Sequence, residues 1–149
     1  MIPKQVVIDT NVCLDLFVFK DPRWVLLLQG LEDGSITAVT RKDCRDEWLA
    51  VLRYPHLPIN IENRDDIIAT FDAHITCVEP ILKTLPLPRC SDKDDQKFLE
   101  IARDSDSSTL ITKDKALLKL ARKNRAAGYY TIETPENFIN GQLLNCAAS

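Results

Sequence analysis

The sequence lacks an apolar run long enough to cross a membrane. Its longest continuous apolar stretch covers only residues 24–28, whereas a membrane-spanning helix needs about 20 such residues. The N-terminal residues also lack the basic and apolar regions that together mark a signal peptide. From these absences we expect a cytoplasmic protein that does not associate with membranes.

The sequence also lacks the cysteine and histidine patterns of disulfide-rich and zinc-binding proteins. The two histidines, His56 and His74, fall in an expected loop and near an expected helix end, and neither has a ligand partner at metal-binding spacing. The five cysteines form an odd set without a Cys-x-x-Cys pair, so neither a disulfide framework nor a thiolate zinc site is predicted. They are Cys13, Cys44, Cys77, Cys90 and Cys146.

An excess of positive charge is missing as well. The chain has 19 basic and 22 acidic residues, which gives a net charge of −3. This balance does not predict a general attraction to nucleic acid. A catalytic cluster of carboxylates would itself make the total more acidic, so the net charge does not exclude a polyanionic substrate.

The remaining composition is that of one soluble domain covering residues 1–149. The hydrophobic fraction is 45% and the charged fraction 28%, both ordinary for a globular protein of this length. Strands alternate with helices along the chain, which predicts an α/β fold with a mostly parallel sheet of four to five strands. Expected strands are at 6–8, 35–39, 109–112 and 129–132. Expected helices are at 22–33, 41–53, 62–75, 93–102, 116–127 and from 135 onward, and Thr40 is the expected cap of the helix at 41–53.

Two acids follow strands that are rich in β-branched residues. Asp9 ends the first apolar run, and Asp114 stands shortly after the strand expected at 109–112. In parallel sheets, ligands bind outside the carboxyl ends of the strands. An Asp after a strand also commonly caps the following turn by accepting a backbone hydrogen bond, and for Asp9 alone this structural interpretation stays open. The repeated pattern predicts that Asp9 and Asp114 lie at the same edge on neighbouring strands.

Two further acids are predicted to face the interior. Glu47 lies one helical turn from the apolar residues Cys44 and Val51, and Asp95 precedes Phe98 by three residues. Satisfying helix N–H groups is an equally good explanation of Asp95 taken alone. We expect no basic side chain at these inward positions. Clustered carboxylates without such partners raise one another's pKa or recruit cations, and oxygen ligands favour Mg²⁺ or Mn²⁺.

Such a metal cluster supports hydrolysis of a phosphodiester without a protein nucleophile, because the metal lowers the pKa of a bound water. The residues expected to bind metal and to be catalytic are Asp9, Glu47, Asp95 and Asp114.

The order and spacing of these acids resemble the PIN-domain ribonucleases, in particular the branch that contains toxins of toxin–antitoxin pairs. The resemblance covers nearly the whole chain and rests on segments 7–12, 46–52, 90–102, 110–114 and 134–138. It implies a three-layer fold, Mg²⁺ or Mn²⁺ as cofactor, and cleavage of single-stranded RNA that leaves 5′-phosphate and 3′-hydroxyl ends. It also implies supporting roles for Asn11, Asp92 and Thr112.

The same resemblance implies an antitoxin protein as partner and a homodimer. One position departs from the family pattern, because Ala116 stands where the family often has another acid. The missing acid affects the expected binding of a second metal ion, whereas the four main acids are all present.

A local excess of basic residues begins beside Asp114. The segment 113–125 contains six Lys and Arg residues against that one acid, and phosphate contacts there would orient an RNA strand. A solvated helix face with cations near its C-terminus is the alternative explanation. The candidate RNA contacts are Lys113, Lys115 and Lys119, with Arg41, Lys42 and Arg45 as a second set.

Two other functions compete with the nuclease. One is a non-catalytic PIN-like module that binds RNA or protein. The other is a phospho-acceptor receiver domain, which fits poorly because it needs an acidic pair after the first strand and a phosphorylated Asp after a middle strand. A haloacid-dehalogenase-type phosphatase would need a second Asp where Asn11 stands.

Overall fold

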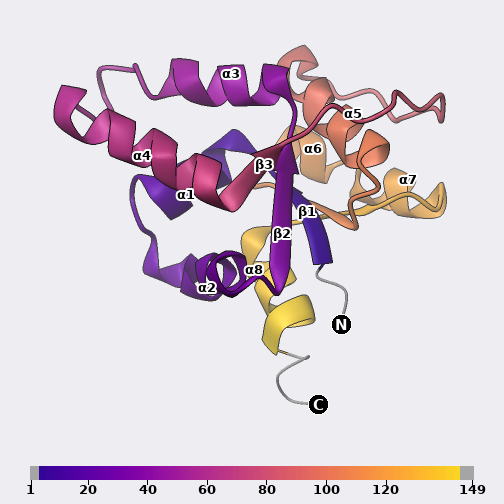
Figure 1. Cartoon of the computed structure of the whole chain (residues 1–149). Coiled ribbons are helices and arrows are strands. Elements are labelled where there is room, and N and C mark those ends of the chain that lie inside the picture. The colour runs from indigo at the N-terminus through magenta and orange to yellow at the C-terminus, as the bar shows by residue number, and fades with distance from the viewer. Residues whose placement is uncertain (1–3, 145–149) are drawn as a thin grey trace.

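The computed structural model describes residues 4–144 and shows a five-stranded parallel sheet (Figure 1). The predicted α/β fold is therefore confirmed. Along the sheet the strand order is β3-β2-β1-β4-β5, and every pairing is parallel. The strands are β1 (Lys4–Ile8), β2 (Ile36–Thr40), β3 (Ile75–Cys77), β4 (Thr109–Ile111) and β5 (Thr131–Glu133).

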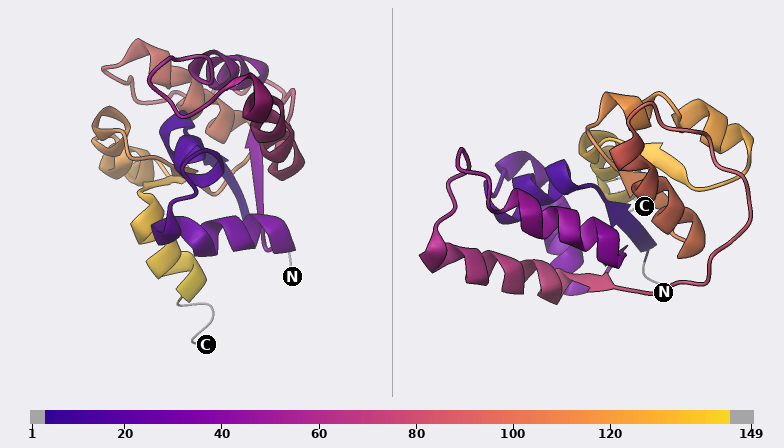
Figure 2. Two further views of the ribbon diagram at one scale, coloured as in Figure 1. Left: turned by 90° about the vertical axis from the view of Figure 1, so that its left-hand side faces the viewer. Right: turned by 90° about the horizontal axis from the view of Figure 1, so that it is seen from above.

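Helices cover both faces of this sheet, so the molecule has three layers (Figure 2). In the described part of the chain, no helix has the length and apolar character needed to cross a membrane. The α-helices are α1 (Thr10–Phe17), α2 (Val25–Asp33), α3 (Lys42–Val51), α4 (Ile61–His74), α5 (Gln96–Asp104), α6 (Lys115–Leu118), α7 (Ala121–Ala126) and α8 (Pro135–Phe138); short turns are η1 (Pro22–Trp24), η2 (Lys93–Asp95) and the π-helical η3 (Ile139–Leu144).

Alternation of side chains along the strands separates the core into two layers. On β1, Val6 and Ile8 pack with α1, α2, α3, α4 and α8, while Val7 between them packs with α5 and α6. Successive side chains of a strand point to opposite faces, so one continuous apolar run supplies both layers. In the first layer Trp48 of α3 stacks on Phe71 of α4 with ring centroids 4.9 Å apart. This contact packs α3 against α4.

Several local predictions were wrong. The edge strand β3 was missed because its three residues continue directly from α4 and only Ile75 is buried. Thr40 ends β2, and the cap of α3 is Arg41, which makes no side-chain capping hydrogen bond. The helix expected at 116–127 is divided into α6 and α7. Cys146 lies outside the described residues.

The order in which strands join the sheet changes sides at β1. The chain adds β2 and β3 on one side of β1 and then crosses to the other side, where β4 and β5 follow. In open α/β sheets such a switch point leaves a crevice at the carboxyl ends of the strands, where ligands bind. Here that position, which we call the crevice, lies after Ile8 and Ile111, which are paired in register.

Candidate metal centre

Asp9 is the first residue of the crevice, immediately after β1. It is buried, with 4% of its surface exposed. Its Oδ1 accepts the Asn11 backbone N–H at 2.7 Å, and its Oδ2 accepts a hydrogen bond from the Thr112 hydroxyl. Asp9 therefore caps α1, as the structural interpretation predicted, and its other oxygen lies against Thr112 at the end of β4.

Asp114 occupies the matching position after β4. It caps α6 by accepting the Ala116 backbone N–H at 2.7 Å, and its own N–H donates to the Thr112 hydroxyl oxygen at 2.9 Å. Thr112 thus donates to one acid and accepts from the backbone of the other. The predicted placement of Asp9 and Asp114 on neighbouring strands is confirmed.

Asp95 reaches the same crevice from η2, the turn before α5. One carboxylate oxygen from each of Asp92, Asp95 and Asp114 lies within 4.8 Å of the other two. Asp92 caps η2 through the Asp94 N–H at 3.0 Å. The structure therefore places Asp92, expected only as a supporting residue, directly beside two of the predicted metal-binding acids.

Asp95 has an oxygen without a hydrogen-bond donor. Its Oδ2 is buried, and no described residue donates to it. A buried polar atom without a partner costs roughly 1–3 kcal/mol, and a divalent cation among three carboxylates would supply the missing interaction. The donor set is entirely oxygen, which is the set that Mg²⁺ and Mn²⁺ prefer. These residues therefore fit a hard divalent ion.

The pKa values show that the acids act on one another. Burial is the main cause that raises the pKa of Asp95 to about 8, and a hydrogen bond and the charge of Asp114 raise it further. Burial likewise raises the pKa of Asp9 to about 6 against the lowering effect of Thr112, and the charges of Asp114 and Glu47 add to the rise. Acids from four separate segments therefore converge on one crevice.

Glu47 enters the crevice from α3 but has a partner of opposite charge. Its Oε1 lies 2.9 Å from the Lys97 ammonium nitrogen, and its Oε2 accepts a hydrogen bond from the Thr10 hydroxyl. The prediction that no basic side chain shares the inward positions is therefore wrong. Lys97 lies in the first turn of α5, and its long flexible side chain extends back to α3.

The other predicted residues lie around this centre. The Asn11 side chain is exposed, and only its backbone N–H contacts Asp9. Lys113 forms an ion pair with Asp15 at 2.6 Å, while Lys115 and Lys119 are exposed. The second candidate set for RNA contacts, which consists of Arg41, Lys42 and Arg45, is engaged in ion pairs with nearby acids.

Two residues of the centre were not predicted as functional. Thr10 stands next to Asp9 in the sequence, and its position beside the strand-end acid was the available signal. Lys97 carried no signal, because its contact with Glu47 spans 50 positions and depends on how α3 and α5 pack.

Comparison with known proteins gives one match. A protein-family model, described as the PIN domain, matches residues 5–116, well over half of the chain. The matched segment begins in β1 and contains every acid of the crevice. Searches of curated proteins and of solved structures each found no match.

Proposed function

The chain belongs to the PIN-domain family, and from this premise we propose that it is a metal-dependent endoribonuclease acting on single-stranded RNA. PIN domains are generally metal-dependent nucleases. The observation that carries the proposal is the acidic crevice at the switch point, where the Asp95 Oδ2 is buried without a donor. An acidic cluster with a purely structural role would be expected to satisfy its own oxygens.

We assign the metal ion, Mg²⁺ or Mn²⁺, to Asp92, Asp95 and Asp114, with Asp9 alongside. A divalent ion held there would supply a water of lowered pKa and would stabilise the negative charge that develops on a phosphodiester. Asp9 is already oriented by Thr112 and by the Asn11 N–H, so its carboxylate has a fixed direction before substrate arrives. Fixed groups of this kind lower the cost of reorganisation during a reaction.

RNA as the substrate is supported by the basic residues beside the crevice. Lys115 directly follows Asp114, and both Lys115 and Lys119 are exposed. Phosphate contacts from such lysines hold a strand without reading its sequence. Lys113 is the weakest of the three candidates, because Asp15 already neutralises it.

A role as a toxin adds a protein partner to this proposal. We propose that an antitoxin restrains the nuclease and that the chain forms a homodimer. Exposed apolar side chains support protein contacts: Ile81 is 88% and Leu82 70% exposed in the Pro-rich segment after β3. Light scattering of the purified chain tests the dimer, and a small overlapping upstream reading frame would support the antitoxin.

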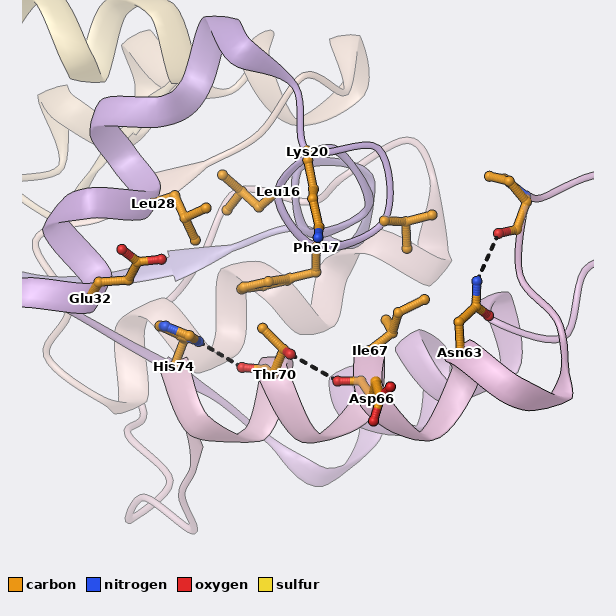
Figure 3. A pocket seen from close by; sticks show the side chains of 12 residues that line it. Leu16, Phe17, Lys20, Leu28, Glu32, Asn63, Asp66, Ile67, Thr70 and His74 are labelled. Carbon is orange, nitrogen blue, oxygen red and sulfur yellow. Dashed lines mark hydrogen bonds between the residues drawn. The ribbon is translucent and has the colours of Figure 1, made fainter.

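A non-catalytic protein-binding module is the second candidate function. A groove of about 510 Å³ lies between α1, α2 and α4, and none of the acids of the crevice lines it (Figure 3). Phe17, Leu28 and Ile67 give it an apolar lining, with Glu32, Asp66 and His74 among the polar groups around it. This groove would serve a binding module whether or not the acids are active.

RNA cleavage decides between the two candidates. Labelled single-stranded RNA is incubated with the wild-type protein in Mn²⁺ or in EDTA, and with Asp95→Asn and Asp94→Asn variants. Asp94 is the matched control, since it neighbours Asp95 but is exposed and outside the cluster. We expect cleavage only with metal, a loss of about a hundredfold or more for Asp95→Asn, and no loss for Asp94→Asn. Cleavage in EDTA, or equal rates for both variants, would overturn the mechanism. Absence of cleavage by the wild type in either metal would favour the binding module.

A further inference from the structure

Glu47 differs from the other acids of the crevice in having a cationic partner. Lys97 donates to its Oε1 and the Thr10 hydroxyl donates to its Oε2, whereas the two oxygens of Asp9 accept from neutral donors, the Asn11 N–H and the Thr112 hydroxyl. By contrast, the Asp95 Oδ2 has no donor among the described residues. Glu47, like Asp9, lies outside the group of carboxylate oxygens from Asp92, Asp95 and Asp114 that come within 4.8 Å of one another.

Lys97 is held firmly in its position. Only 17% of its side-chain surface is exposed, and its ammonium group also donates to the backbone oxygen of Asp94. The ammonium nitrogen lies 5.3 Å from the centre of the Phe98 ring, an arrangement that adds a cation–π attraction. These contacts are more than an exposed surface ion pair provides, so the ammonium is a fixed part of the crevice.

The ammonium and the Glu47 carboxylate form a close ion pair. The Lys97 nitrogen lies 2.9 Å from the Glu47 Oε1, so the two groups make a charge-assisted hydrogen bond. A charged ammonium at hydrogen-bond distance from a carboxylate takes the place that a metal ion would occupy there. It also repels a divalent ion placed next to it.

We propose that Lys97 is an internal counter-ion that keeps Glu47 from binding metal and so limits the crevice to one divalent ion, held by Asp92, Asp95 and Asp114. This inference rests on the metal site of the proposed function. In it, Lys97 and Glu47 are positioning residues that stabilise the approach of α5 to α3. The residues that would hold the metal are then those of η2 and the end of β4, with Asp9 alongside.

Calorimetric titration with Mn²⁺ tests the inference without measuring activity. Lys97→Met removes the charge and keeps most of the aliphatic side chain. Lys93→Met is the matched control, because Lys93 lies in the adjacent turn η2 and is exposed. We expect one Mn²⁺ per chain for the wild type and for Lys93→Met, and two for Lys97→Met, in which Glu47 is free to bind.

A double variant, Lys97→Met with Glu47→Gln, separates the metal site from the ion pair. We expect it to bind one Mn²⁺ with a Kd within about threefold of the wild-type value, since neither residue is a ligand in this account. Circular dichroism verifies the fold of each variant. If Lys97→Met alone fails to fold, the double variant, which leaves no unpaired charge, still provides the decisive measurement.

Two results would overturn the inference while leaving the metal site in place. One is a single Mn²⁺ bound by folded Lys97→Met, and the other is a Kd weakened more than about tenfold in the double variant, which would make Glu47 a ligand. Failure of the wild type to bind Mn²⁺ would instead remove the metal site, and this inference with it.

Discussion

The Thr112 hydroxyl donates a hydrogen bond to the Asp9 carboxylate across 103 positions of sequence. This contact joins the ends of β1 and β4, the two strands between which the chain changes sides of the sheet. The same hydroxyl oxygen accepts the Asp114 N–H. One fully buried side chain therefore sets the relative positions of the two acids that end the central strands.

Replacing Thr112 with Val keeps the shape of the side chain and removes both hydrogen bonds. The buried Asp9 oxygen then loses its donor, so we expect the free energy of unfolding to fall by about 1–3 kcal/mol. Urea denaturation measures the change, and Thr112→Ser, which keeps the hydroxyl, serves as the control. A loss below about 0.5 kcal/mol for Thr112→Val would show that the hydrogen bond does not hold Asp9.

The stability of the metal-free protein is expected to fall as pH rises from about 6 to about 8. Burial, with the hydrogen bond and charge of Asp114, raises the pKa of Asp95 from 3.8 to about 8, so in this window the folded state keeps a proton that the unfolded state has lost. Stability falls with pH wherever the folded state binds more protons. Thermal unfolding in EDTA at pH 6, 7 and 8 should show a shallower decline for Asp95→Asn than for the wild type. Equal slopes would mean that Asp95 titrates normally.

Mn²⁺ is expected to raise the unfolding temperature, because it binds the folded crevice and not the unfolded chain. At a concentration one hundred times its Kd, a ligand stabilises by about 2.7 kcal/mol, which corresponds to an increase of about 5–10 °C for a domain of this size. Scanning calorimetry should show the increase for the wild type and Asp94→Asn but not for Asp95→Asn. An equal increase in all three proteins would place the ion elsewhere.

RNA binding is expected to depend on Lys115 and Lys119. Each lysine that contacts a phosphate of a single strand adds about 0.7 to the slope of log Kd against log salt concentration. The double variant Lys115→Ala/Lys119→Ala should therefore show a slope smaller by about 1.4, measured in EDTA so that the RNA stays intact. Lys83→Ala is the control. Lys83 pairs with Asp106, which precedes β4 and therefore lies at the edge of the sheet opposite to the crevice. An unchanged slope would support the solvated helix face instead.

The sequence predicted the strand-end acids well because their placement depends on local patterns. A β-branched run followed by Asp is visible without knowledge of the fold, and parallel pairing then brings Asp9 and Asp114 to one edge. The inward direction of Asp95 followed from its spacing to Phe98 and Leu99, both of which are buried. These predictions needed only strand alternation and helical periodicity.

The features that the sequence did not reveal depend on tertiary packing. The contact between Lys97 and Glu47 requires α5 to pack beside α3, and nothing in either helix specifies that distance. The edge strand β3 has three residues, too few for a periodic pattern. The division between α6 and α7 was hidden because the spacing of the apolar residues within 116–121 is compatible with one continuous helix.

The position of the bound metal distinguishes a site at Asp92, Asp95 and Asp114 from one that includes Glu47. Crystals soaked in Mn²⁺ and measured at a wavelength with strong manganese anomalous scattering would locate the ion independently of any assay. We expect one anomalous peak, bounded by carboxylate oxygens of Asp92, Asp95 and Asp114, with the Lys97 ammonium still on Glu47. A peak coordinated by Glu47, or no peak in the crevice when Mn²⁺ is bound elsewhere, would contradict this expectation.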